Sequence, residues 1–461
     1  MRIYNSLSKQ LEDFKPIEPG LVKMYSCGPT VYMHPHIGNW RLFTLTDMVY
    51  RTLRFNGYKV DFIMNMTDVG HLFEEGSNPE GGEDKVEKQA IEEGKSAKEI
   101  VNFYIKEFLN DYKNLNLTEP RKFTRASEYI DGQIDLIATL EEKGYTYETS
   151  DGIYFDTSKF KNYGQLSGLT IENIKEGARI DPNPEKKNST DFALWKFSPK
   201  DKKRQQEWQS PWGIGFPGWH LECSAMVLAE LGETIDIHLG GEDLKMIHHQ
   251  NEIAQSESAT GKTFVNYWVH SAFLMVDSGK MSKSLGNFYT LDEVINRGYS
   301  PLDLRYLYMT AHYRTPLNFT WEALGSAQNS LNKIYDIVGS YEQDSKADVS
   351  DKYIKKFREK LEDDFNTPEA LAVVWELLKS NIPEASKLNT VLKMDEFLGL
   401  KLQEHIGYEI PNNINDLAKM RREYRKNGIW DKADVIRRQM LDLGYIVEDT
   451  PAGEYKIKKK F

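Results

Sequence analysis

The sequence predicts an α/β fold: a Rossmann-like parallel-sheet domain split by an insertion, followed by an α-helical bundle and a small C-terminal module. Two observations lead to this prediction. Strand-like apolar runs alternate with amphipathic helical patterns up to about residue 290, and long helical patterns separated by polar breaks follow. With 461 residues, the chain can form several domains that each bury a core.

The first half of the sheet is predicted from a βαβ pattern near the N-terminus. Residues 21–27 and 60–65 have strand patterns, and residues 40–56 have the spacing of an amphipathic crossover helix. His36-Ile37-Gly38-Asn39 lies between the first strand and this helix. Doubly wound folds bind nucleotides at the carboxyl end of such a strand. We therefore expect a ligand site there.

The second half of the sheet is predicted from residues 234–238, which run into a glycine-rich turn, and from residues 264–270. Between the two halves, residues from about 120 to 205 mix a helical pattern (127–143), short strands and a lysine-rich loop. This mixture predicts an inserted subdomain rather than a continuation of the sheet.

The later part of the chain is predicted to be helical, with long patterns at 320–341, 351–365 and 367–382. The whole chain then divides into six segments. In order they are the first half of the Rossmann domain (1–120), the connective insertion (121–205), the second half of the Rossmann domain (206–290), a region after the sheet (291–340), the helical bundle (341–405) and the C-terminal module (406–461).

The composition limits the class of protein. Charged residues make up 28% and hydrophobic residues 40%, as is ordinary for a globular enzyme. No stretch approaches the roughly 18 apolar residues that a membrane-spanning helix needs, and no secretory leader is visible at the N-terminus. The two cysteines are too few for a disulfide framework. We therefore expect a cytoplasmic protein with no membrane partner.

The net charge of −11 argues against a surface that binds nucleic acid throughout, and we expect no DNA partner. The charge is uneven, however. Residues 412–461 hold 12 lysines and arginines against 8 aspartates and glutamates. This basic tail fits a protein that contacts RNA at one end. A solvated helix with a lysine-rich terminus explains the composition equally well.

The cysteines and histidines suggest a metal site. Cys27 ends the first strand pattern, and Cys223 lies in a later helical pattern. His248 and Glu252 are four residues apart on a predicted helix, so they share a face and can approach one ion. Two cysteines, a histidine and a glutamate suit zinc. His249 with Glu252 is an alternative at this stage, and so is a solvent-facing His-Glu pair.

A second phosphate-type signature lies about 240 residues after the first. Lys280-Met281-Ser282-Lys283-Ser284 places two lysines and two serines on a loop that Gly286 follows, and such a loop can hold a triphosphate. One short motif is weak, whereas two in this order are a strong indication of nucleotide binding.

The chain resembles the class I aminoacyl-tRNA synthetases, and among them the cysteinyl-tRNA synthetases, over nearly its whole length. Besides the two signatures, the matching runs are 27–32, 65–68, 191–196, 210–213, 217–226, 236–255 and 447–453. The first signature departs from its commonest form, because Asn39 stands where the last histidine usually does. Asparagine can still donate a hydrogen bond to a phosphate or a ribose.

The resemblance implies a reaction and two metal ions. L-cysteine and ATP with Mg²⁺ would give cysteinyl-adenylate, and the cysteinyl group would pass to the terminal adenosine of tRNA(Cys). One Zn²⁺ per chain would be held by Cys27, Cys223, His248 and Glu252, with the substrate thiolate as a further ligand. Zinc discriminates a thiolate from an alcohol, whereas a hydrophobic pocket separates near-isosteres by only ~10- to 200-fold.

The resemblance also implies roles for single residues. The ATP phosphates would bind to His36, Asn39, Lys280 and Lys283, the ribose would lie near Gly240, Gly241 and Asp243, adenine would border Met275 and Val276, and cysteine would contact Thr67 and Trp219. Residues 291–340 would contact the tRNA stem, and Arg425, Trp430, Asp434 and Asp449 would make the C-terminal module tRNA-binding.

Several alternatives remain open on the sequence. The glycines and Trp219 fit tight packing as well as binding, and Trp430 fits a core anchor with Asp434 as a surface charge. Two rival functions are a related ligase that joins cysteine to an amino sugar and a non-catalytic paralogue that only binds tRNA or cysteine. The basic C-terminal segment disfavours the first rival. The signature lysines and the four metal ligands disfavour the second.

Overall fold

The computed structural model describes residues 1–69, 84–168, 183–199, 203–281, 286–407, 410–449 and 454–459. Lys283 lies outside the described residues, and Lys280 is described by its backbone. Across these ranges, no helix has both the length and the apolar character needed to span a membrane.

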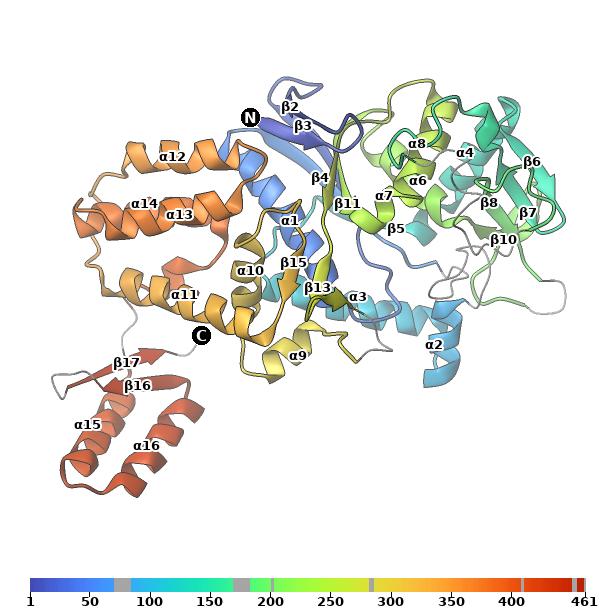
Figure 1. Cartoon of the computed structure of the whole chain (residues 1–461). Coiled ribbons are helices and arrows are strands. Elements are labelled where there is room, and N and C mark those ends of the chain that lie inside the picture. The colour runs from blue at the N-terminus through green and yellow to red at the C-terminus, as the bar shows by residue number, and fades with distance from the viewer. Residues whose placement is uncertain are drawn as a thin grey trace. The chain divides into compact units, whose positions relative to one another are not determined.

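A five-stranded parallel sheet with the order β12-β11-β3-β4-β5 lies at the centre of the first unit of the chain (Figure 1). It consists of β3 (Leu21–Ser26), β4 (Lys59–Met66), β5 (Lys122–Arg125), β11 (Ile235–Gly241) and β12 (Val265–Ser271). The predicted split parallel sheet is confirmed, because β11 and β12 follow the insertion and still pair in parallel beside β3. The strand order switches between β3 and β11, which is where sheets of this kind hold ligands.

The crossover helix α1 (Ile37–Phe55) begins three residues earlier than the hydrophobic spacing predicts. His36 is its N-cap residue, and Asn39 completes a capping box with it. A capping box usually has Glu or Gln at that third position, so the general pattern does not reveal this helix start. Helices α2 (Lys85–Glu93) and α3 (Ala97–Asn114) lie in the chain between β4 and β5.

The insertion has its own antiparallel sheet in the order β6-β7-β8-β10-β9. Its strands are β6 (Thr146–Thr149), β7 (Gly152–Phe155), β8 (Phe192–Phe197), β9 (Trp208–Ser210) and β10 (Gly213–Pro217). The sheet therefore continues to Pro217, beyond residue 205, where the sequence analysis ended the insertion. At the other end, β5 belongs to the parallel sheet, so the insertion starts after Arg125. Helix α4 (Ile130–Glu142) packs into a core that includes Phe155 and Trp195.

Three helices and a small sheet complete the region around the carboxyl ends of the parallel strands. The helices are α6 (Trp219–Glu230), α7 (Glu242–Lys245) and α8 (His248–Thr260). The small sheet has the order β14-β13-β15, with β13 (Leu274–Val276), β14 (Gly279–Lys280) and β15 (Leu317–Phe319). Helices α9 (Leu291–Asn296) and α10 (Pro301–Met309) connect β14 to β15.

The remaining chain is helical up to a terminal hairpin. Helices α12 (Asp351–Leu361), α13 (Thr367–Lys379) and α14 (Glu384–Leu398) pack on one another as a bundle, as Figure 1 shows. Helix α11 (Trp321–Ser340) precedes them. A hairpin of β1 (Arg2–Asn5) and β2 (Gln10–Asp13) lies at the N-terminus, where β1 packs beside β12.

A fully buried ion pair joins α10 to α1 and α14. Arg305 donates to Asp47 Oδ2 at 2.6 Å and to the carbonyl oxygen of Leu398 at 2.7 Å. Burial raises the pKa of Asp47, but Arg305 and Arg51 outweigh it and hold that pKa below its usual range. The bundle is thus fixed to the parallel-sheet domain by a paired charge rather than by apolar packing alone.

The chain divides into two compact units, residues 1–331 with 346–400 and residues 332–345 with 401–461. The second unit contains α15 (Asn412–Lys426), α16 (Trp430–Asp442), β16 (Tyr445–Asp449) and β17 (Tyr455–Lys459). Its buried core consists of Ile414, Ala418, Ile436, Met440 and Val447. The two helices and the hairpin therefore form a small unit with apolar packing of its own.

Candidate metal centre and nucleotide site

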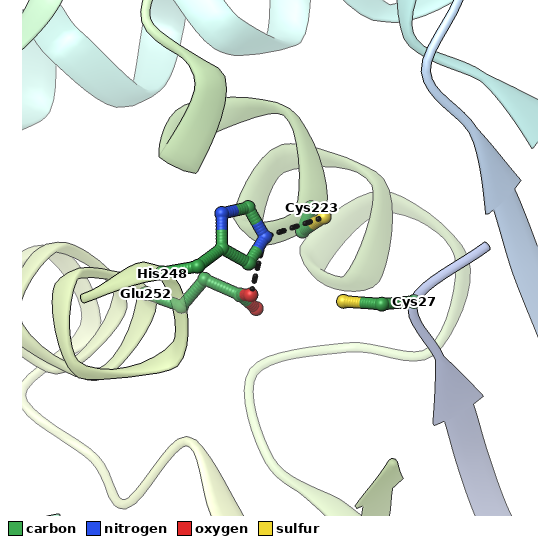
Figure 2. A group of neighbouring side chains, drawn as sticks. All are labelled: Cys27, Cys223, His248 and Glu252. Carbon is green, nitrogen blue, oxygen red and sulfur yellow. Dashed lines mark hydrogen bonds and ion pairs between the residues drawn. The ribbon is translucent and has the colours of Figure 1, made fainter. Parts of the chain in front are cut away.

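Four buried side chains from three elements meet at the carboxyl end of β3 (Figure 2). Cys27 follows β3, Cys223 lies on α6, and His248 and Glu252 lie one turn apart on α8. One ligand atom from each residue lies within 4.8 Å of the others. His248 Nε2 is 3.4 Å from Cys223 Sγ and 3.0 Å from Glu252 Oε1. The fold thus gathers into one site the four residues singled out in the sequence.

The charges in this cluster favour a cation. The hydrogen bond from Cys27 is the main cause that lowers the pKa of Cys223 to about 6, while burial and Cys223 raise the pKa of Cys27. Burial disfavours the charged form of Glu252, yet His238 and His248 lower its pKa to about 2. Burial also opposes protonation of His248, but Cys223 and Glu252 raise its pKa to about 10. Without a metal, the site therefore holds a thiolate and a carboxylate beside the His248 imidazolium. A divalent cation that takes the place of the imidazolium proton would be balanced by the two negative charges.

The donor set also has the unsatisfied atom expected of a metal ligand. Among the described residues, Glu252 Oε1 is buried and makes no hydrogen bond of acceptable geometry, although His248 Nε2 lies 3.0 Å from it. Such an atom costs free energy unless a partner satisfies it. Its other oxygen, Oε2, lies 2.9 Å from His238 Nε2, a contact that orients the carboxylate from outside the ligand set. Two sulfurs, one nitrogen and one oxygen fit a four-coordinate zinc site.

His249, which the sequence left as an alternative to His248, also lies close to the cluster. Cys27, His238, His249 and Glu252 form a second grouping with the same spread of ligand atoms. His249 Nε2 lies 3.4 Å from Cys27 Sγ, and its Nδ1 lies 2.8 Å from His270 Nε2. His248 is nearer to two members of the first set, whereas His249 approaches one thiol. The solvent-facing alternative for the His-Glu pair is wrong, because both side chains are buried.

The two residues expected at the amino-acid substrate are Trp219, next to the cluster, and Thr67, just after β4. The Trp219 ring is 4.3 Å from the His248 ring. Thr67 follows β4 and bridges to Thr30, three residues after Cys27. Its side chain accepts a hydrogen bond from Asn65 at 3.1 Å. Trp219 therefore adjoins the cluster directly, and Thr67 is held by the strand next to the one that ends at Cys27.

Gly240 and Gly241 close β11, and both meet close neighbours. A Cβ on Gly240 would collide with the His249 ring, and a Cβ on Gly241 would collide with the carboxylate of Asp243. Tight packing therefore explains both glycines without a ligand. Asp243 lies on α7, and burial raises its pKa.

The first signature forms the N-terminus of α1. His36 Nδ1 accepts hydrogen bonds from the backbone N–H groups of Gly38 at 3.0 Å and Asn39 at 3.2 Å. Asn39 Oδ1 accepts from the backbone N–H of His36 at 3.0 Å. Asn39 thus has a structural role in the cap of α1, where its amide oxygen is the acceptor.

The second signature begins in a hairpin beside the first. Met275 pairs with Lys280, and Val276 pairs with Gly279. Val276 is buried and Met275 is half-buried, so they face different surroundings. A Cβ on Gly38 would lie 3.2 Å from Met281 Cε. The described part of the second signature therefore touches the turn of the first.

The residues expected to bind tRNA lie together in the second unit. The Arg425 guanidinium lies 5.1 Å from the centre of the Trp430 ring, and Trp430 is 56% exposed. Asp434 is exposed on α16. The core-anchor alternative for Trp430 is wrong, because the ring lies outside the buried core of this unit.

Asp449 is paired with arginines of α15. Arg421 donates two hydrogen bonds to it, at 2.8 and 2.9 Å, and Arg425 lies 3.3 Å away. The hydrogen bonds from Arg421 are the main cause that lowers its pKa. The sequence analysis gave no role to Arg421. Its position four residues before Arg425 on one helix face was the signal that could have identified it.

Comparisons with known proteins agree over most of the chain. The family model described as the tRNA synthetases class I (C) catalytic domain matches residues 13–329, and the DALR domain model matches residues 356–403. The protein named Cysteine--tRNA ligase 1 from Burkholderia lata is 44% identical over 457 residues, which cover 98% of this chain and 96% of that protein.

Two solved structures have a similar fold. They are Mycobacterium tuberculosis methionyl-tRNA synthetase in complex with methionyl-adenylate and the same enzyme bound by methionyl-adenylate. Their TM-scores are 0.56 and 0.53, and both are 14% identical to this chain. The matches cover 82% and 84% of this chain and 90% of each solved chain. At this identity they show the class of fold and nothing finer.

Proposed function

We propose that this chain is an ATP-dependent cysteine–tRNA ligase. The proposal follows from its family, because the chain belongs to the class I tRNA synthetases and, among them, to the cysteine–tRNA ligases. It would activate L-cysteine with ATP and Mg²⁺, release pyrophosphate, and transfer the cysteinyl group to the terminal adenosine of tRNA(Cys). The observation that carries this proposal is the buried cluster of two thiols, an imidazole and a carboxylate at the switch point of the sheet. A sulfur-rich metal site is a natural device for selecting a thiol substrate.

Cys27, Cys223, His248 and Glu252 would hold Zn²⁺, and the chemistry and spacing of these four donors support that assignment. When bound, zinc supplies a soft acid that binds a thiolate and discriminates against the hydroxyl of serine. His238 would keep Glu252 oriented through its contact with Oε2. The discrimination needs no hydrolytic editing domain, because it is made at the first binding step.

Two residues would position the amino acid beside this cluster. Trp219 would pack against bound cysteine, which its ring contact with His248 supports. Thr67 would contact the amino group from the end of the neighbouring strand. The cysteine carboxylate would then be free to attack the α-phosphorus of ATP as pyrophosphate leaves.

The two signatures would act on the nucleotide. His36, Asn39, Lys280 and Lys283 would stabilise the charge that develops on the phosphates, an electrostatic role rather than an acid-base one. Support comes from the contact between Met281 and the turn at Gly38. The ribose would lie near Gly240, Gly241 and Asp243, and adenine would border the backbone of Met275 and Val276.

The second unit would bind the anticodon of tRNA(Cys). Trp430 and Arg425 present an exposed aromatic ring beside a guanidinium, a combination that stacks on unpaired bases. Asp434 and Asp449 would add hydrogen bonds. The reaction would take place in the cytoplasm, since two reduced thiols at one metal site suit a reducing compartment.

The proposal is tested by incubating the purified protein with radiolabelled cysteine and ATP. One reaction receives total tRNA and a parallel reaction receives an amino sugar. Labelled tRNA is the expected product. A labelled small molecule in the second reaction alone would identify the related cysteine–amino sugar ligase instead. Binding of tRNA without product in either reaction would support the non-catalytic paralogue.

A further inference from the structure

A buried arginine with no acidic partner lies just behind the first signature. Arg41, on α1, is 3% exposed. Its Nη1 donates to the carbonyl oxygens of Ala272 and Phe273, both at 2.8 Å. Its Nη2 donates to those of Thr315 at 2.6 Å and His312 at 3.4 Å. No carboxylate among the described residues pairs with it, although buried cations usually have one.

The four carbonyl groups belong to two connecting segments of the chain. Ala272 and Phe273 connect β12 to β13, and His312 and Thr315 lie between α10 and β15. The two segments are also hydrogen-bonded to each other, because the backbone N–H of Ala272 donates to the carbonyl oxygen of Tyr313 at 2.9 Å. Arg41 therefore links α1 to both segments that lead into the small sheet, the one before β13 and the one before β15.

This small sheet carries the start of the second signature. β13 pairs in parallel with β15 and antiparallel with β14, which includes Lys280. The hairpin turn consists of Asp277 and Ser278, with φ values of +48° and +63°. Asn318 on β15 accepts from the Ser278 N–H at 2.7 Å, and the Asp277 N–H donates to Phe319 at 3.1 Å. The place of Lys280 is thus set by the same strands that Arg41 holds.

We infer that Arg41 is a positioning residue for ATP. Arg41 fixes the β13–β14 hairpin against α1 and thereby sets the position of the two phosphate-binding signatures relative to each other. The inference rests on the proposed function, since it assumes that both signatures hold ATP. It adds a residue that touches neither the nucleotide nor the metal cluster. The contact of Met281 with the turn at Gly38 shows that the two signatures adjoin.

The chemistry of arginine explains why this residue type is needed. A guanidinium has five N–H donors in a rigid fork, so it can satisfy four carbonyl oxygens from two directions at once. A lysine ammonium has three donors on a single nitrogen. Burial lowers the pKa of Arg41 to about 10, so the group still carries its charge at neutral pH.

The test is Arg41→Lys in the full-length enzyme, with Arg305→Lys as the matched control. Arg305 is equally buried and also donates to carbonyl oxygens, but none of them is in the small sheet. In ATP–pyrophosphate exchange, Arg41→Lys should lower kcat/KM for ATP by about 10²-fold, the scale for misplacing a reacting group by ~1 Å. The KM for cysteine and the zinc content should stay at the wild-type values. Arg305→Lys should lower thermal stability without changing the KM for ATP.

A second variant keeps the inference testable if Arg41→Lys does not fold. Asn318→Ala removes the acceptor that holds the hairpin turn, at a partly exposed position. It should raise the KM for ATP several-fold, and when both variants fold, their effects should not add, because they act on one hairpin.

Three results would overturn the inference. They are normal ATP kinetics in a folded Arg41→Lys protein, normal ATP kinetics in Asn318→Ala when Arg41→Lys does not fold, and equal losses in Arg41→Lys and Arg305→Lys. Failure of the proposed function is distinct from these, because the wild-type enzyme itself would then give no cysteine-dependent exchange.

Discussion

Replacing Trp430 with alanine should separate tRNA charging from cysteine activation. The ring is 56% exposed and lies outside the core of its unit, so the free energy of unfolding should fall by no more than about 1 kcal/mol. Its partner within the protein is the Arg425 guanidinium, a contact worth about 0.5 to 1 kcal/mol at an exposed site. The main loss should therefore appear only when RNA is bound.

The size of that loss follows from one base stacked on the ring. Such a stack contributes about 1 to 3 kcal/mol. Since each 1.4 kcal/mol is a factor of ten, kcat/KM for tRNA should fall by roughly 5- to 150-fold. Arg425→Ala should also weaken charging, while removing one of the two arginines that hold Asp449.

The assay compares aminoacylation with ATP–pyrophosphate exchange in the same preparation. Exchange should keep its wild-type rate, because the second unit contains none of the residues proposed to bind cysteine or ATP. Val435→Ala is the matched control, since Val435 is 61% exposed on the same helix and carries no ring. If the folded Trp430→Ala protein charges tRNA at the wild-type rate, the stacking role is refuted.

Three further predictions concern the first unit. Elemental analysis of the Cys223→Ser protein should show that it has lost its zinc, and unchanged zinc content would contradict the site. Loss of Glu252 should weaken zinc binding less, because a carboxylate is a harder ligand than a thiolate. Lys283→Ala should slow adenylate formation in single turnovers by about 10²- to 10³-fold, the scale for losing one electrostatic stabiliser, with cysteine binding unchanged. Burial raises the pKa of Asp47, but Arg305 and Arg51 outweigh this effect, so the pKa is lower in the folded protein than in the unfolded chain. The ionised Asp47 therefore stabilises the fold at pH values above its unfolded pKa of about 3.9. This stabilisation is lost as the pH falls through the lower pKa of the folded state. Denaturant unfolding from pH 6 to pH 3 should therefore show a steeper loss of stability than in Asp47→Asn, and parallel curves would disprove the linkage.

The regular elements were predictable because their patterns are local. The run at 21–27 and the helix at 40–56 show their periods within a few residues, and they match β3 and α1 closely. The short strands β9 and β10 were missed for the opposite reason. Three to five residues do not define a period, and their place in the insertion sheet depends on pairing with β8.

The candidate site was predictable in its residue types and less so in its surroundings. Rare cysteines and an i,i+4 His-Glu pair are visible in a sequence, whereas the contact of His238 with Glu252 depends on β11 and α8 coming together. Arg41 shows the same limit more strongly. Four carbonyl partners that lie over 200 residues away leave no local trace, so its pattern is that of any polar residue on a helix.

The cap of α1 also determines which nitrogen of His36 carries the proton. Because Nδ1 accepts two backbone N–H groups, the neutral ring is the Nε2–H tautomer, in which Nε2 is a donor. A proton on Nδ1 would remove the acceptor that these two backbone N–H groups share. In the proposed function, the neutral His36 ring would therefore offer a phosphate oxygen a directed N–H dipole rather than a net charge. The positive charge that balances a triphosphate would then come from Mg²⁺ and from the lysines of the second signature.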